Sequence, residues 1–157
     1  MVAVGAQLPD LTVPDDQGHA VRLRELPGPY VLYVYPADDT PGCTRQACSF
    51  RDHYAAFKQA GVQVYGVSPD TVASHVAFRD KYRLPFPLLA DPDHKLAEAL
   101  GAWGEQTYGG KKSVGIRRTT YVIGGDGRVQ YVYPEVKPEE NAPAILKDLG
   151  IEPHPAA

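Results

Sequence analysis

The sequence predicts an α/β fold in which helices flank a central mixed β-sheet. Short runs of β-branched and aromatic residues alternate with amphipathic segments, which is the order expected of parallel strands joined by helices. A glycine-rich turn in the C-terminal third separates two further strand-like runs and adds an antiparallel pair. At 157 residues with 43% hydrophobic content, the chain is expected to form one domain, residues 1–157, whose core needs no disulfide bonds.

The first half of the chain predicts a strand, a helix and a second strand. Residues 30–35 form a β-branched and aromatic run closed by Pro36, which indicates a buried strand. Apolar residues then recur at steps of three and four, so residues 43–60 are expected to form an amphipathic helix that Gly61 ends. Residues 62–67 are a second β-branched run, and the three elements together make one right-handed crossover unit.

The middle of the chain continues this alternation. A Ser-Pro-Asp start signal precedes a helix expected at residues 71–83, a strand follows at 86–90, and a short helix is expected at 94–100. Residues 109–113 are rich in glycine and lysine without the full pattern of a phosphate-binding loop, and we expect a mobile basic loop there.

The C-terminal third predicts a hairpin and a final helix. Residues 119–123 and 128–133 flank a Gly-Gly-Asp-Gly turn, residues 138–149 form the helix, and residues 151–157 are expected to be a loose tail. This order of elements is that of a thioredoxin-like α/β domain with additions. The order alone does not determine the chemistry.

Composition and charge narrow the function classes. A net charge of −3 offers no basic field for a phosphate backbone, so nucleic acid is not an expected partner. Residues 1–10 lack the pattern of a signal peptide and no apolar stretch is long enough to span a bilayer, so we expect a cytoplasmic protein without a membrane partner. Two cysteines are too few for a secreted disulfide framework, and a close pair indicates redox chemistry or metal binding.

Both cysteines lie in the stretch 36-PADDTPGCTRQACSF-50, and Cys43 falls in the first turn of the expected helix. The amide N–H groups and the positive end of the helix dipole favour a thiolate there. Thr40 has two interpretations: its hydroxyl can hydrogen-bond the sulfur or an incoming oxygen, or it can serve only as the helix N-cap. Asp38 and Asp39 would oppose a thiolate if they pointed inward, so we expect both in solvent.

The position of Cys48 poses a geometric problem. Residues five apart in a regular helix have Cα atoms about 8.6 Å apart, which exceeds the limit of roughly 7 Å for a disulfide. If the cysteines pair, the first turns of the helix must unwind, which makes the segment a two-state element. The spacing argues against a C-x-x-C oxidoreductase and for a two-step chemistry in which one sulfur is oxidised and the other resolves the product.

The residues around Cys43 resemble a known family. Pro36, Thr40 and Cys43 form the pattern P-x-x-x-T-x-x-C, and the run YPADDTPGCTRQACSFRD closely resembles the active-site segment of the peroxiredoxins. The placement of Cys48 is similar to that in the bacterioferritin comigratory protein or Q-type subgroup, the atypical two-cysteine peroxiredoxins. The resemblance extends over most of the chain, including VQVYGVSPDT, FPLLADPDHKLAEALGAWGE and GIRRTTYVI.

This resemblance implies a thiol peroxidase with a thioredoxin-like fold and no cofactor. Cys43 would attack the O–O bond of hydrogen peroxide or an organic hydroperoxide to give a sulfenic acid, and Cys48 would condense with it to a disulfide. Thioredoxin or a similar thiol donor would then reduce that bond. Thr40 would hydrogen-bond the reacting oxygen, and Pro36 would shield the thiolate from water. Similar proteins are often monomers and some are dimers, and both states remain open here.

The resemblance also implies an arginine beside the sulfur. In similar proteins it stands just before a hairpin strand in a G-I-x-R pattern, which selects Arg118. A register slip of one residue would instead turn Arg117 toward the site. Gln46 occupies a position at which many related sequences carry glutamate.

The two cysteines also allow other interpretations. The chain could be a non-catalytic redox sensor whose Cys43–Cys48 bond reshapes the helix, or a thioredoxin-fold binding protein with idle cysteines. A zinc site at Cys43, Cys48 and His53 is disfavoured, because ligands at these helical steps do not converge and a structural site takes four. The remaining histidines are expected at the surface, namely His19, His75, His94 and His154.

Overall fold

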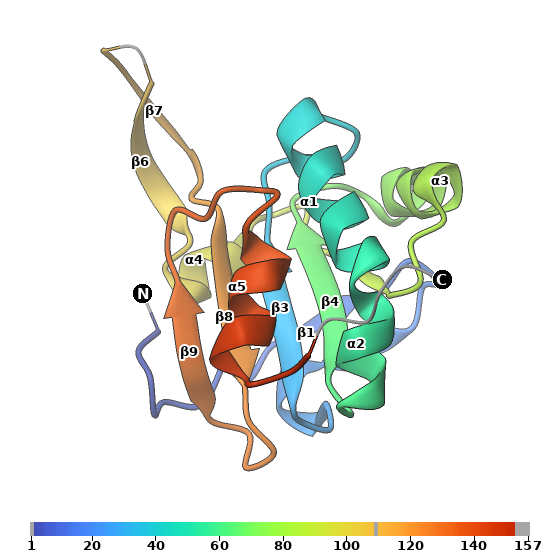
Figure 1. Ribbon diagram of the computed structural model, residues 1–157. Coiled ribbons are helices and arrows are strands. Elements are labelled where there is room, and N and C mark those ends of the chain that lie inside the picture. Colours follow the sequence, from blue (N-terminus) through green and yellow to red (C-terminus); the bar gives the residue numbers. More distant parts are fainter. Residues whose placement is uncertain (1, 109, 153–157) are drawn as a thin grey trace.

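A five-stranded mixed sheet forms the centre of the molecule. The computed structural model describes residues 2–108 and 110–152, and Figure 1 shows the sheet with helices on both faces. The strand order is β5-β4-β3-β8-β9, in which β3, β4 and β5 are parallel, β8 is antiparallel to β3, and β9 is antiparallel to β8. The bounds of these strands are β3 (Tyr30–Val34), β4 (Gln63–Ser68), β5 (Leu88–Ala90), β8 (Thr119–Ile123) and β9 (Val129–Tyr133).

Helices cover both faces of this sheet. In Figure 1 α1, α2 and α5 lie in front of the strands and α4 lies behind them, while α3 lies at the side of β5, with which it is in contact. Within the described residues the α-helices are α1 (Pro41–Asp52), α2 (Tyr54–Gln59), α3 (Val72–Tyr82), α4 (Lys95–Leu100) and α5 (Asn141–Asp148). None of these helices is long and apolar enough to cross a membrane.

Two apolar cores lie on opposite faces of the sheet. Along β3, Val31 and Tyr33 belong to the core shared with α1, α2 and α5, whereas Leu32 and Val34 belong to the core shared with α4. Side chains alternate between faces along a strand, and a strand covered on both faces is buried at every position. All five residues of β3 are buried, as this arrangement requires. Cys43 packs at the edge of the first core.

The predicted fold class is confirmed, and so is the order of its main elements. The elements predicted at residues 30–35, 62–67, 71–83, 94–100 and 119–133 differ from the observed bounds by at most one residue at either end. The N- and C-caps of α3 are Thr71, whose hydroxyl accepts from Ser74 N, and Arg83. Ile151, in the segment expected to be a loose tail, packs against the core, and residues 153–157 lie outside the described residues.

The prediction of one helix over residues 43–60 was wrong, because the chain forms α1 and α2 with a break at His53. The backbone of His53 has a ψ of 3°. In the next turn Ala56 N donates a hydrogen bond to His53 O, three residues earlier, as in a 3-10 helix. His53 Nδ1 lies 2.8 Å from Ser49 O, the same carbonyl that accepts from His53 N. The side chain and the backbone of His53 thus share one acceptor at the point where the helix breaks.

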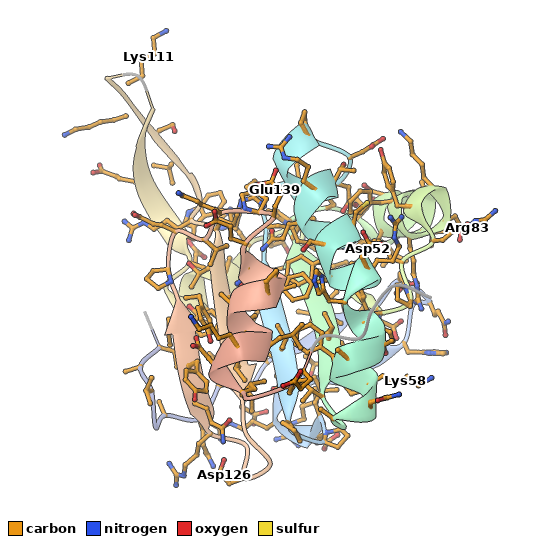
Figure 2. All side chains as sticks on the ribbon, in the orientation of Figure 1. Asp52, Lys58, Arg83, Lys111, Asp126 and Glu139 are labelled. Atoms are coloured by element: carbon orange, nitrogen blue, oxygen red, sulfur yellow. The ribbon has the colours of Figure 1, made fainter. Side chains whose placement is uncertain are left out.

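Two hairpins were missed. Near the N-terminus β1 (Thr12–Pro14) pairs with β2 (Ala20–Arg22), followed by the 3-10 helix η1 (Leu23–Glu25). Further on, β6 (Trp103–Tyr108) pairs with β7 (Lys111–Ile116). The mobile loop expected at residues 109–113 is therefore wrong for 111–113, which are strand, while Gly109 lies outside the described residues. Figure 2 places Lys111 at the tip of this hairpin, which projects away from the sheet.

Candidate active site

Cys43 lies in the first turn of α1, after the loop that follows β3. The thiol is almost completely buried, at 1% exposure, and it is not part of a disulfide. The helix begins with Pro41 after Thr40, and its first backbone bond runs from Thr44 N to Thr40 O at 2.8 Å. The remaining amide groups of this first turn point toward the start of the helix, where a negative charge on the sulfur is favoured.

Arg118 is brought to this sulfur from the start of β8. Its Nη2 donates to Cys43 Sγ at 3.3 Å, and its Nη1 donates to Gln46 Oε1 at 2.6 Å. The guanidinium is therefore fixed by two groups on α1 that lie one turn apart. A fixed cation beside a thiol stabilises the thiolate and can polarise an oxygen that approaches it.

The orientation of Gln46 is itself fixed by α5 and β8. The fully buried Gln46 side chain donates from Nε2 to Asn141 Oδ1 at 3.1 Å, and the Thr120 hydroxyl donates to the same oxygen at 2.8 Å. Sequence reasoning noticed Gln46 only as a departure from related sequences and missed Asn141 and Thr120. The available signal was weak: an asparagine in the first turn of the helix expected at residues 138–149.

Arg117, the alternative from the sequence, points elsewhere. Its side chain is exposed and Nη2 donates to Glu105 O at 3.3 Å in β6. A Cβ atom added to Gly104 would lie only 2.9 Å from Arg117 Nη2. The absence of a side chain at Gly104 therefore allows Arg117 to pack against β6. The two arginines thus serve different neighbours, and the structure brings Arg118 to Cys43.

Thr40 and Pro36 lie in the loop before α1. Thr40 occupies the N-cap position, but its side chain makes no capping bond, and its hydroxyl donates instead to Ala37 O at 3.1 Å. The hydroxyl oxygen retains its capacity to accept a hydrogen bond. Pro36 is exposed, so any shielding of the sulfur has to come from its place in the loop rather than from burial.

Cys48 lies on the same helix as Cys43 and is half-buried and free. Burial, and to a smaller degree Asp52, raise the pKa of the Cys48 thiol, while Arg51 lowers it in part. The net result is a thiol that stays protonated at neutral pH while α1 is intact. Because both cysteines belong to one regular helix, five residues apart, their Cα atoms are too far apart for a disulfide in this conformation.

The expectation that Asp38 lies in solvent was wrong. Its side chain is only 6% exposed and binds Tyr35, Ser74 and His75, and His75, expected at the surface, has no exposed side-chain area. Both corrections have one cause: α3 packs against the loop that carries Asp38. Asp39 does lie at the surface, where it pairs with Lys81.

Among the described residues, one group has the spacing to hold a metal ion. The ligand atoms of Asp38, Asp70 and His75 lie within 4.8 Å of one another. All of these atoms already take part in hydrogen bonds within the protein: Asp70 Oδ2 accepts from Asp38 N and from the Ser68 hydroxyl, and the other two residues bind each other. The donor set is thus satisfied by protein groups, and we do not assign these residues as metal ligands.

Comparisons with known proteins identify the family of the chain. Residues 4–132 match the AhpC/TSA family. The chain is 41% identical over 149 residues to peroxiredoxin Bcp of Bacillus subtilis, covering 94% of this chain and 95% of the relative. It is 44% identical over 150 residues to the chloroplastic peroxiredoxin Q of Oryza sativa subsp. japonica, covering 94% and 67% respectively.

Solved structures give the same result. The bacterioferritin comigratory protein of Xanthomonas campestris superposes with a TM-score of 0.86 at 34% identity, over 94% of this chain and 98% of that one. A peroxiredoxin Q variant from Xylella fastidiosa gives a TM-score of 0.88 at 30% identity, over 96% of both chains. These named peroxiredoxins, matched over most of their length and sharing the fold, make the chain a thiol-dependent peroxidase. The chain belongs to the AhpC/TSA family and, within it, to the peroxiredoxins of the Bcp and Q type.

Proposed function

We propose that the protein reduces hydroperoxides in a two-cysteine cycle in which Cys43 reacts first and Cys48 second. The observation that carries this proposal is the 3.3 Å contact from Arg118 Nη2 to the buried Cys43 Sγ at the start of α1. The Cys43 thiolate attacks one oxygen of the O–O bond, which breaks, and the other oxygen leaves as water or an alcohol after protonation. Cys43 is then a sulfenic acid.

The groups around Cys43 act on charge that develops in this step. Arg118 interacts with the sulfur and with the negative charge that builds on the leaving oxygen, and the Thr40 hydroxyl has a free lone pair for the peroxide O–H. Donors that are already in place before the reaction are usually the largest source of rate. Pro36 narrows the approach to the sulfur from its side of the loop.

The second step requires α1 to unwind. Cys48 attacks the sulfenic sulfur, an S–S bond forms, the S–O bond breaks and water leaves. Unwinding shortens the distance between the sulfurs and exposes Cys48, which removes the burial that keeps its thiol protonated. An external dithiol, for which thioredoxin is the proposed donor, then exchanges with the disulfide and restores both thiols.

The proposed substrates are hydrogen peroxide and organic hydroperoxides. The Xanthomonas campestris relative is described by its alkyl peroxide reduction activity, and it shares 34% of its sequence with this chain. The reacting O–O bond is common to both substrate classes, so the same groups act on either one.

Rapid mixing of the fully reduced protein with an equimolar amount of hydrogen peroxide tests the proposal. We expect fast loss of both thiols to an intramolecular disulfide, measured by thiol counting and intact mass. The Cys43→Ser variant should not react, and the Cys48→Ser variant should stop at a sulfenic acid. Oxidation at the rate of an ordinary free thiol would contradict the proposal and leave a redox sensor or a binding protein as the function.

A further inference from the structure

A buried polar network beside the active-site loop has no part in the chemistry described so far. Asp38 lies in the loop between β3 and α1, and three side chains bind its carboxylate. The Tyr35 hydroxyl donates to Oδ1 at 2.6 Å, the Ser74 hydroxyl donates to Oδ2 at 2.7 Å, and His75 Nδ1 lies 2.8 Å from Oδ2. Ser74 and His75 belong to α3, so the network joins the loop to that helix.

The partners of His75 determine how many protons the network holds. His75 Nε2 lies 2.8 Å from Leu89 O, and a carbonyl oxygen can only accept, so Nε2 carries a hydrogen. In a neutral imidazole Nδ1 would then carry a lone pair. This nitrogen and Asp38 Oδ2 would be two acceptors 2.8 Å apart with no hydrogen between them. One further proton is therefore required between Asp38 and His75.

The surroundings assign this proton to the imidazole. Burial raises the pKa of the Asp38 carboxyl. The hydrogen bonds from His75, Tyr35 and Ser74 together lower it by more than burial raises it, so the net pKa lies below the ordinary value. A second carboxylate, Asp70, lies on the same side of His75. The Asp38 carboxylate already accepts from the Tyr35 and Ser74 hydroxyls, as an ionised carboxylate does, so the bridging hydrogen belongs to Nδ1 of His75.

The other titratable groups near His75 do not compete for this charge. Burial is the main cause that raises the pKa of the Tyr35 hydroxyl well above its ordinary value, so Tyr35 remains a neutral donor. Asp91, which follows β5, is turned away and accepts from Leu96 N and Ala97 N at the start of α4. Asp39 and Lys81 pair with each other at the surface.

The pair fixes the part of the loop that places the catalytic groups. Asp38 N also donates to Asp70 Oδ2 at 2.8 Å, so both the backbone and the side chain of Asp38 are held. The neighbouring Ala37 O accepts the hydroxyl of Thr40, and Thr40 O accepts the first backbone bond of α1, from Thr44 N. Release of Asp38 would therefore loosen Thr40 and the turn that contains Cys43.

We propose that His75 is a positioning residue of the peroxidase reaction: a buried imidazolium whose ion pair with Asp38 holds the active-site loop against α3. The effect on rate rests on the proposed function of Cys43, whereas the charge state of His75 does not. Loss of the proton leaves two acceptors facing each other and releases the loop. A cleft of about 190 Å³ lined in part by Asp38, Ser74 and Phe78 gives water access to the network.

The first test is the charge state of His75 in the reduced wild-type protein. In a spectrum of protein labelled with ¹⁵N in histidine, both ring nitrogens of His75 should be protonated at pH 7.5, a condition chosen about one unit above the ordinary histidine pKa. The signals are assigned by their absence in His75→Gln. A neutral ring with a hydrogen on Nε2 alone would overturn the proposal, and this result does not depend on whether Cys43 reacts with peroxide.

The second test is the pH profile of Cys43 oxidation by hydrogen peroxide in Asp38→Asn. The asparagine amide can donate to Nδ1 of a neutral imidazole, so the bridge in this variant needs no added proton. On the alkaline side the wild-type rate should fall by up to about tenfold per pH unit once the pair loses its proton, whereas the Asp38→Asn rate should not show this fall. Identical alkaline profiles for the two proteins would overturn the proposal.

Asp39→Asn is the matched control. It removes the neighbouring carboxylate, which is paired with Lys81 and not with His75, and asparagine tolerates its positive φ of 57°. This variant should keep the alkaline fall of the wild type. A loss of the fall in Asp39→Asn as well would show that any change of charge in the loop has this effect, and would count against a specific role of His75.

Discussion

At the scale of single residues, the reactivity proposed for Cys43 depends on the placement of one guanidinium. Arg118 donates to both Cys43 Sγ and Gln46 Oε1, and Asn141 Oδ1 binds the other end of the Gln46 amide. The acceptor beside Arg118 is thus a neutral amide oxygen rather than a carboxylate. The positive charge is therefore not compensated by Gln46 and remains available to the sulfur.

Replacement of Arg118 should affect the first chemical step strongly. In Arg118→Met the rate of Cys43 oxidation by hydrogen peroxide should fall about 10²-fold, because a preorganised cationic donor is lost. Arg117→Met is the matched control, since Arg117 is exposed and donates to Glu105 O. Stopped-flow measurement of the rate of Cys43 oxidation in both variants tests this prediction. Equal losses in the two would indicate a general charge effect and contradict the role of Arg118.

The residues differ in how far the sequence could predict them. Thr40 and Cys43 stand in one local pattern whose spacing fixes their relative positions, whereas Arg118 is 75 residues from Cys43 and could be expected there only from the resemblance to the peroxiredoxins. Asp38 and His75 are 37 residues apart, and their contact exists only because α3 packs on the loop before α1. No local periodicity carries that information, and for this reason the histidine was expected at the surface.

At the scale of elements, α1 has two opposing requirements. An intact first turn holds Cys43 beside Arg118, while a disulfide to Cys48 needs that turn to open. The ease of unwinding is therefore part of the proposed cycle, and it depends on helix propensity between the two cysteines as well as on tertiary contacts.

Substitutions at Arg45, between the two cysteines, should tune the second step. Arg45→Ala and Arg45→Gly both remove the exposed ion pair with Glu139, and they differ by about 1 kcal/mol in helix propensity. Disulfide formation after oxidation of Cys43 should be roughly fivefold faster in the glycine variant. The preceding formation of the sulfenic acid should be alike in both. Equal rates of disulfide formation would show that unwinding of α1 does not limit this step.

The elements also show where sequence patterns carry little information. The strands β3 and β8 are buried at every position and appear as runs of β-branched and aromatic residues. The helices α3 and α4 have recognisable caps or stops, so the bounds of all four elements could be predicted closely. In β7, Lys111 to Val114 are all exposed, and only Ile116 is buried. A hairpin that projects into solvent has no hydrophobic alternation, so only its backbone pairing reveals it.

At the scale of the whole molecule, the N-terminal segment closes the second core and is tied to the sheet at one buried carboxylate. Leu8, Val13 and Leu23 pack with the strands on the face that α4 covers. Asp16, which follows β1, is 7% exposed and accepts from Arg79 of α3 and from Leu88 N of β5. The N-terminal hairpin, α3 and the edge strand therefore meet at this side chain.

Asp16→Ala should accordingly destabilise the whole molecule, because Asp16 joins Arg79 of α3 to Leu88 of β5. The change leaves the Arg79 guanidinium and the Leu88 amide without their partner in a largely buried place, and the free energy of unfolding should fall by about 2 to 3 kcal/mol. Asp10→Ala is the control: it also removes an aspartate that binds an arginine, but the Asp10–Arg22 pair is exposed and should change stability little. Urea unfolding measures the free energy of unfolding of both variants, provided that its dependence on urea concentration has the same slope in each. If Asp16→Ala unfolded at the same urea concentration as Asp10→Ala, the Asp16 contacts would contribute no more to stability than an exposed ion pair.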